Sequence, residues 1–270
     1  MVQYQKSQNT EIWYLYKGMS ISKHKGLYGL RRIVSAETMY DAVMQTGIIP
    51  FFAGPVPGYS IEEMVPRECW FTDECLGPWD WKIDLVQSGD IAYGKFLNGG
   101  KAAFASARWY KELMNWRRAQ EKYRPKDEKL LKIMTFVREN GSAEVKELRQ
   151  LLGLNKARVD SLLTKLQMDT LIVTGDIKRV YGGADLHYSG WQRSSFCMPD
   201  DLFEDFSADF FGKGRNPEDP AAVFFGKGTT KHKPVAAETR KPEESYKLLA
   251  DLIMEQFPLA TDSGIAKILG

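Results

Sequence analysis

The chain has 270 residues, 43% of them hydrophobic and 12% aromatic, which is enough for two domains or one large one with a sizeable core. Thirty-seven Lys and Arg stand against 35 Asp and Glu, a formal net charge of +2, so any nucleic-acid face must be local. No apolar run approaches the ~20 residues that span a bilayer, and the first residues lack the layout of a signal peptide, so we expect a cytoplasmic protein without a membrane partner.

Residues 1–34 are expected to form a basic, partly irregular segment. Five cations lie between residues 17 and 34, with no acid before Glu37: Lys17, Lys23, Lys25, Arg31 and Arg32. Such a segment either lies along DNA phosphates or extends into solvent. In the first case Arg31 and Arg32 are candidate DNA contacts.

Residues 35–124 are expected to form a mixed α/β domain. Ser35 is a candidate N-cap of a helix that stops at Gly47, and "IIPFF" reads as a short buried strand. "DIAYGKFL" and "AAFASARW" flank Asn98-Gly99-Gly100, a hairpin signal, and residues 111–120 have helical spacing. Trp79, Trp81, Trp109 and Trp116 either stack on bases or, as we expect, lie in the core.

The organisation changes after Pro125, where we place a domain boundary. Apolar residues at helical spacing predict helices over about residues 127–140, 142–152 and 155–168, with Ser142 and Asn155 as N-caps. Strands over 171–174 and 177–181 are expected around a two-residue turn at Gly175-Asp176. The helices are too short to stand alone, so one shared core is expected from six side chains: Val145, Leu148, Val159, Leu162, Leu163 and Leu166.

Three helices followed by a hairpin are the order of a winged helix-turn-helix, here predicted over residues 125–200. The third helix would enter the major groove of DNA. Its exposed cations and hydroxyl are the candidate contacts: Lys156, Arg158, Ser161 and Lys165. Lys178 and Arg179 are the candidates on the wing, but neighbouring strand residues point to opposite faces, so only one can reach a given phosphate.

The charge of this region is mild for a DNA-binding domain. Between residues 126 and 181 there are eleven Lys and Arg and eight acids, an excess of three positive charges. The same fold also serves as a protein-protein module, and this charge leaves that alternative open.

The C-terminal third is expected to contain an acidic helix and a wrapping loop over 201–242, then helices over 243–270. "PDDLFEDFSADFF" has apolar residues at helical spacing, and "PEESYKLLADLIMEQF" precedes a short last helix capped by Thr261 or Asp262. "FFGKG" occurs twice, but neither copy has the spacing of a phosphate-binding loop.

No metal site or cofactor is expected. Cys69, Cys75 and Cys197 are widely spaced and match no zinc pattern, and the three histidines lie at no ligand spacing. The acids of "PRECWFTDEC", with Asp73 and Glu74 beside Trp70 and Phe71, would suit a base-excising site, although a loop of solvated acids is the commoner case.

"LLTKLQMDTLIVTGD" resembles the third helix and wing of AlkZ-related proteins, which are relatives of the YcaQ-type winged-helix DNA glycosylases. "GPWDWKIDLVQSGDIAYGKFLNGGKAAFASARWY" and the final "SGIAKILG" are similar to other segments of the same family. The resemblance implies a winged-helix fold and DNA as partner. The glycosylases use a Gln-aliphatic-Gln motif, whereas the Gln-x-Gln here, Gln3-Tyr4-Gln5, has an aromatic centre, so the activity does not carry over residue by residue.

The expected fold is α+β, with a central winged helix-turn-helix, a small mixed α/β N-terminal domain and C-terminal helices. The expected function is binding of duplex DNA, linked to repair and without catalysis. Two alternatives remain: a DNA glycosylase acting on alkylated bases, and an assembly module that binds a protein partner. The oligomeric state is not predicted.

Overall fold

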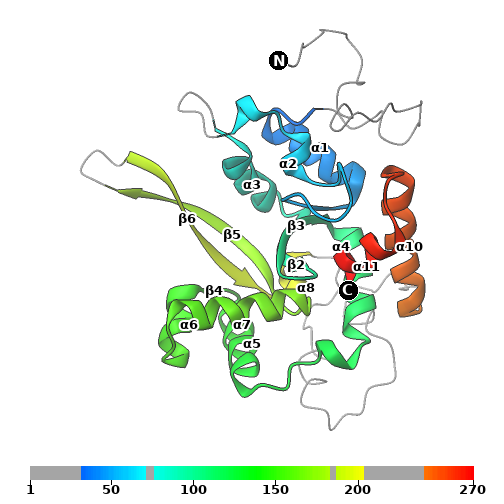
Figure 1. Ribbon diagram of the computed structural model, residues 1–270. Coiled ribbons are helices and arrows are strands. Elements are labelled where there is room, and N and C mark those ends of the chain that lie inside the picture. Colours follow the sequence, from blue (N-terminus) through cyan, green and yellow to red (C-terminus); the bar gives the residue numbers. More distant parts are fainter. Residues whose placement is uncertain (1–31, 71–75, 183–186, 204–239) are drawn as a thin grey trace, which may run out of the picture.

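The computed structural model describes residues 32–70, 76–182, 187–203 and 240–270. Within these ranges the chain forms ten α-helices and one six-stranded antiparallel sheet, with strand order β1-β3-β2-β5-β6-β4 (Figure 1). The mixed helix and strand content agrees with the predicted class.

The first helix, α1 (Ala36–Thr46), begins and ends where the sequence predicts. The Ser35 hydroxyl accepts a hydrogen bond from the Thr38 amide, and Gly47 ends the helix with a φ of 76°. The next strand, β1 (Ile48–Pro50), is fully buried, as expected. The short helix α2 (Ile61–Met64) and the 3-10 helix η2 (Arg67–Cys69) precede α3 (Pro78–Gln87).

The predicted hairpin at Asn98-Gly99-Gly100 is confirmed. It joins β2 (Ile91–Leu97) to β3 (Lys101–Ser106), and the two glycines have φ values of 77° and 68°. The following helix, α4 (Ala107–Arg118), starts four residues earlier than predicted. Tyr110, Leu113 and Met114 are fully buried on one side of it, so packing extends the helix towards β3. The 3-10 helix η3 (Glu121–Tyr123) follows.

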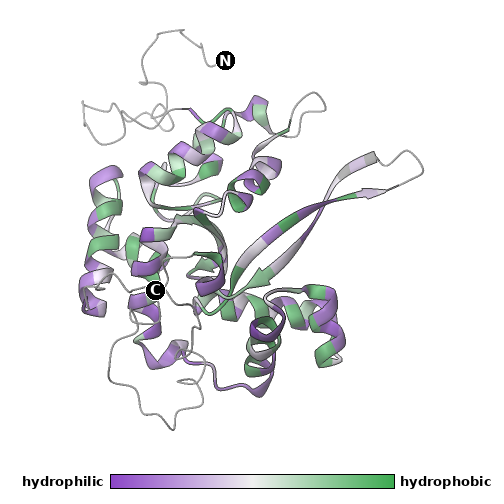
Figure 2. Cartoon of the chain, turned by 180° about the vertical axis from the view of Figure 1, so that it is seen from behind, coloured by the Kyte–Doolittle hydropathy of each residue, from purple (hydrophilic) through white to green (hydrophobic). Residues whose placement is uncertain are grey.

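The C-terminal helices share a core with these N-terminal elements. Both α10 (Pro242–Gln256) and α11 (Asp262–Leu269) form as predicted, with Thr261 as the N-cap of α11. Their apolar residues lie in the same hydrophobic cluster as α1, β1, β2, β3 and α4: Leu249, Ile253, Ile265, Ile268 and Leu269. Figure 2 shows both hydropathy colours along α10, as a helix with one buried and one solvated face requires.

A second hydrophobic cluster lies under three helices, α5 (Glu128–Asn140), α6 (Val145–Leu152) and α7 (Lys156–Met168). All three predicted helices are present. Four of the six predicted core residues are buried, namely Leu148, Val159, Leu163 and Leu166, while Val145 and Leu162 are half-buried against the same cluster.

The prediction that Ser142 caps the second helix is wrong. Residues 143–144 instead form a short strand, β4 (Ala143–Glu144), which pairs with Phe196 and Ser195 at the edge of the sheet. The helix therefore starts later, and Glu144 is its N-cap. Pairing satisfies main-chain groups that a longer helix would have satisfied internally.

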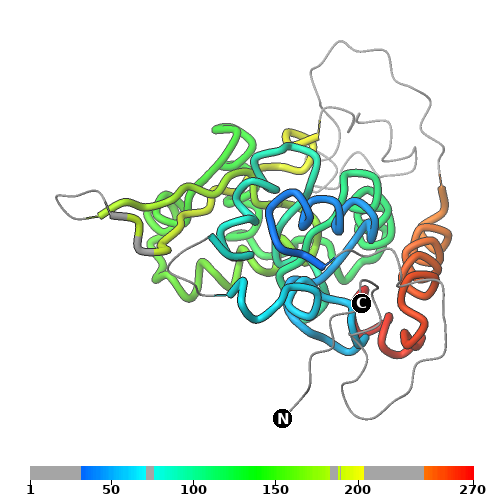
Figure 3. Tube along the Cα trace, turned by 90° about the horizontal axis from the view of Figure 1, so that it is seen from above, coloured from blue at the N-terminus to red at the C-terminus, as the bar shows by residue number. Residues whose placement is uncertain are grey.

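The prediction of a two-residue turn at Gly175-Asp176 is also wrong. Both residues lie inside β5 (Val173–Gly182), which pairs along its length with β6 (His187–Cys197). Lys178 is consequently opposite Arg193 of β6, which lies beyond the predicted strands. A wing-like hairpin does follow the third helix, and it projects away from the molecule on the side opposite α10 (Figures 1 and 3).

The described part of the acidic segment forms α8 (Pro199–Leu202) and ends at Phe203. The rest of the predicted acidic helix and both "FFGKG" copies lie outside the described residues.

Arg117 joins the two hydrophobic clusters. This fully buried side chain donates hydrogen bonds to the main-chain oxygens of Leu269 at 2.8 Å, Met168 at 2.6 Å, and Phe96. Its partners belong to α11, α7 and β2, so one guanidinium satisfies the ends of three elements that come from distant parts of the sequence.

Candidate nucleic-acid interface

The first turns of α7 present the exposed polar residues that the sequence predicts. Asn155 caps the helix by accepting a hydrogen bond from the Arg158 amide at 3.0 Å, and Gly153, in the left-handed region at φ 64°, ends α6 just before it. Lys156, Arg158 and Ser161 are exposed. Lys156 and Arg158 lie in the first turn of the helix, where the helix dipole favours anions, and Ser161 lies in the second turn.

The C-terminal half of α7 is covered by β2 and the turn that follows it. The Gln167 side chain accepts a hydrogen bond from the Lys95 amide at 2.9 Å. A Cβ at Gly100 would lie 2.8 Å from Cγ2 of Thr164, which shows how closely the β2–β3 turn approaches the helix. A groove of DNA could therefore reach only the first two turns of α7.

Lys165 is half-buried, although the sequence predicted that it would be exposed. Its Nζ lies 2.6 Å and 2.7 Å from the two oxygens of Asp169, whose side chain is completely buried. Burial raises the pKa of Asp169, while the hydrogen bond from Lys165 opposes that rise. Lys165 thus compensates an internal carboxylate, and its role as a DNA contact stays a prediction.

The two cations predicted on the wing point to opposite faces of β5, as expected. Lys178 is two-thirds exposed and lies 4.0 Å from Asp176. Arg179 is only one-quarter exposed, and its Nε lies 3.9 Å from Oδ1 of Asp80 on α3. Of the pair, Lys178 is therefore the one whose charge is available at the surface.

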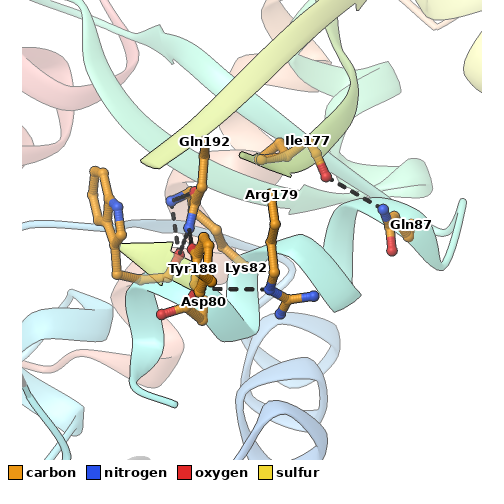
Figure 4. A network of polar contacts seen from close by, with 8 residues as sticks. Asp80, Lys82, Gln87, Ile177, Arg179, Tyr188 and Gln192 are labelled. Carbon is orange, nitrogen blue, oxygen red and sulfur yellow. Dashed lines mark hydrogen bonds and ion pairs between the residues drawn. The ribbon is translucent and has the colours of Figure 1, made fainter. Parts of the chain in front are cut away.

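A polar cluster, which we call the α3 clamp, ties the hairpin to α3 and consists of Asp80, Lys82, Tyr188 and Gln192 (Figure 4). Gln192 accepts a hydrogen bond from Lys82 at 2.6 Å and donates to the Tyr188 hydroxyl at 2.9 Å. The Tyr188 hydroxyl donates in turn to Asp80. The contacts anchor β6 at two positions four residues apart.

A second set of contacts anchors β5 to the same helix. Gln87 donates to the Asp176 side chain at 3.1 Å and to the Ile177 main-chain oxygen at 3.3 Å. Ile177 packs with Ile83 and Val86 of α3 in a small buried cluster. Both strands are therefore held by α3, which fixes the direction in which the hairpin projects.

Lys82 is the one cation of the α3 clamp, and it is buried. Its residue is 3% exposed, and its Nζ lies 2.8 Å from the Trp79 main-chain oxygen and 3.5 Å from the centroid of the Trp79 ring. Burial lowers the pKa of Lys82 from 10.5 to about 7, and the nearby Asp80 only partly opposes this shift. An amine in this position changes its charge near neutral pH.

Two exposed residues of the hairpin were missed by the sequence reasoning. Arg193 is the direct cross-strand partner of Lys178 and is exposed. Trp191 is 72% exposed, the most exposed large hydrophobic side chain in the described part of the chain. Gln192 points at α3, so its neighbour Arg193, which lies in the regular part of the ladder, is on the face turned away from α3. Extending the predicted wing to residue 197 would have revealed this pairing.

The structure does not bring Arg32 to α7. Arg32, which precedes α1, is exposed and forms an ion pair with Glu68 of η2. In Figure 1, α1 lies in the upper part of the molecule and α7 in the lower part. Arg31, Asp73 and Glu74 lie outside the described residues, as does the Gln3-Tyr4-Gln5 sequence.

The described ranges contain neither a candidate metal site nor a candidate membrane-spanning helix. They contain no group of three or more His, Cys, Asp or Glu that could hold a metal ion. In the same part of the chain no helix has both the length and the apolar character to cross a membrane.

Comparison with protein families matches residues 33–270 to the family described as "AlkZ related". No curated protein and no solved structure matches the chain.

Proposed function

Because the chain belongs to the AlkZ-related family, we propose that it is a DNA-repair-linked protein that binds duplex DNA through a winged helix-turn-helix. The observation that carries the proposal is the order of elements from residue 128 to residue 197. A helix, a short strand, two helices and a hairpin follow one another, and the short strand β4 pairs with the second strand of the hairpin. In winged-helix proteins the helix before the hairpin enters the major groove.

The proposed DNA contacts come from two elements. On α7, Lys156 and Arg158 bind phosphates or base edges, and Ser161 is within the same exposed face. On the hairpin, Lys178 and Arg193 contact the backbone beside the groove, because they form one cross-strand pair on the face turned away from α3. Arg179 faces Asp80 and serves instead to orient the hairpin.

The experiment compares charge reversal at the proposed interface with the same reversal elsewhere. Binding of the full chain to a 20-base-pair duplex is measured by fluorescence anisotropy over a salt series. Lys156→Glu with Arg158→Glu should weaken binding at low salt and reduce the slope of log K against log salt by about 2, because two phosphate contacts are lost. The matched control is Lys247→Glu with Lys267→Glu, two exposed lysines on α10 and α11.

The control variant should bind as the wild-type protein does. Equal losses in the two variants would show that binding follows net charge alone and would remove α7 from the interface. Absence of any binding by the wild-type protein at low salt would contradict the proposed function itself.

We propose that the chain acts without catalysis, with a DNA glycosylase as the second candidate. The family favours the second candidate, because the sequence resembles relatives of glycosylases. The Gln-aliphatic-Gln motif of those enzymes is not matched by Gln3-Tyr4-Gln5. Incubation with duplexes that carry alkylated bases, followed by cleavage at abasic sites, separates the two. Strand cleavage that depends on the protein would contradict the non-catalytic proposal.

The assembly-module alternative depends on where the acidic segment after Phe203 packs. That segment lies outside the described residues. The wild-type binding measurement also tests this alternative, because a helix face covered by protein would bind no DNA.

A further inference from the structure

Trp191 lies next to a shift of register in the pairing of β5 with β6. Arg179 pairs with Gln192, and Tyr181 pairs with Tyr188. Between these two pairs β5 advances by two positions and β6 by four. The extra residues of β6 form a bulge that contains Gly190, whose φ is 82°. Bulges of this kind redirect side chains and occur next to functional sites.

Gly190 is required by the backbone conformation of the bulge and not by close packing against a neighbour. A Cβ at position 190 would meet nothing within 4 Å, so space is available, but a side chain at a φ of 82° is strained. The bulge therefore depends on Gly190, and its consequence is an indole that is 72% exposed. An aromatic side chain this exposed has no packing role in the described structure.

The surroundings of Trp191 are cationic. Arg193 follows two residues later, with Lys178 directly opposite it on β5, and both are exposed. Like charges placed opposite each other on a hairpin are mildly destabilising by themselves. An anionic partner would relieve that repulsion, and the combination of cations with an exposed aromatic ring is the one that binds unpaired nucleotides.

The hairpin is also held in place for such a contact. The clamp residue Gln192, between Trp191 and Arg193, is fixed to Lys82 and Tyr188, and Tyr188 is fixed to Asp80. A base that stacks on a side chain of this anchored strand costs little backbone freedom at the moment of binding.

On the basis of the proposed function, on which this inference rests, we infer that Trp191 is a stacking site for an unpaired nucleobase. Lys178 and Arg193 hold the flanking phosphates. The preferred ligand is accordingly duplex DNA that contains a bulged or extruded base, in place of uniformly paired duplex.

The test uses two duplexes of the same sequence, one fully paired and one with a single bulged 2-aminopurine. The wild-type chain should bind the bulged duplex about tenfold more tightly and quench the 2-aminopurine fluorescence, because base stacking on an aromatic ring accounts for a difference of this order. Trp191→Ala should bind both duplexes with the affinity of the paired one and should not quench. Trp191→Phe should retain part of the preference.

Two further variants test the role of the bulge and the specificity of the effect. Gly190→Ala keeps the indole but strains the bulge, so it should lower the preference without abolishing binding to paired duplex. Leu259→Ala removes an exposed apolar side chain between α10 and α11 and should behave as the wild-type protein does.

The failures of the two proposals are distinguishable. Equal wild-type affinity for the two duplexes, or an unchanged preference in Trp191→Ala, would overturn the stacking site while leaving DNA binding intact. No wild-type binding to either duplex would overturn both.

Discussion

Burying Lys82 makes the stability of the fold depend on pH. The pKa of its amine is about 7 in the folded protein and 10.5 without burial, so the unfolded chain binds more protons between those values. The free energy of unfolding should therefore rise with pH from about 7 to 10.5, by up to about 1.4 kcal/mol per pH unit from this group. Below pH 7 the full cost of burying the cation is present.

The variant Lys82→Met tests that prediction through the difference in unfolding free energy from the wild-type protein, measured in denaturant at several pH values. The free energy of unfolding of the wild-type protein should rise relative to that of the variant as pH rises from 7 to 9. Lys247→Met removes an exposed lysine as a control and should run parallel to the wild-type curve. Parallel curves for Lys82→Met as well would mean that the amine stays charged throughout.

Single residues differ in how well the sequence predicts them. Asn155, Thr261 and Ser35 were recognised as caps, because a cap depends on its immediate neighbours. Lys82 could be recognised only as part of a Trp-x-Trp-Lys segment, because its burial requires Gln192, 110 positions away. The same reason hides the ion pair between Lys165 and a buried Asp169 from a reading of exposed helix faces.

Gly175 shows how an element was mispredicted. Gly-Asp between apolar runs is typical of a hairpin turn, but here the glycine lies in a strand at a shift of register. A Cβ at position 175 would lie 2.8 Å from the sulfur of Cys197, so the residue is required for close approach between β5 and β6. Helices were predicted better than strands because their apolar spacing is local, whereas β5 pairs with residues 187–197, which follow it at a distance in the sequence.

Gly175→Ala should consequently destabilise the protein by about 1–3 kcal/mol through overpacking against Cys197. Gly182→Ala is the matched control in the same strand, because a Cβ there would meet nothing within 4 Å. The denaturant midpoint of both variants gives the comparison. If Gly175→Ala unfolds at the same denaturant concentration as Gly182→Ala, the Cys197 side chain moves aside without cost and close approach does not require the glycine.

Arg117 acts at the scale of the whole molecule, because it links α11, α7 and β2. Arg117→Met should leave buried main-chain oxygens without partners and lower the free energy of unfolding by about 3 kcal/mol or more. Arg108→Met, an exposed position on the same helix, should change it by no more than about 0.5 kcal/mol. Similar denaturant midpoints for the two variants would show that water or a shifted side chain replaces the guanidinium.

The distribution of cores could not be predicted from the sequence. The predicted boundary at Pro125 falls between Met114 of one hydrophobic cluster and Leu130 of the other, but the first cluster also takes in Val173, Cys197 and Phe203 from beyond that boundary. The sequence placed residues 243–270 in a segment of their own, and the structure packs their apolar side chains with α1, β1 and α4. Periodicity identifies which side of a helix is buried but not the partner that buries it. Which segments fold independently stays a prediction.

The shared core also sets an order in which the chain can fold during synthesis. The cluster under α5, α6 and α7 uses residues from Leu130 to Met198, so all of its members are available once that stretch has left the ribosome. The other cluster begins at Ile33 but includes Leu269, and it stays open until the last helix emerges. The N-terminal third of the nascent chain is therefore made first and completed last, and we expect its apolar strands to be prone to aggregation in the interval.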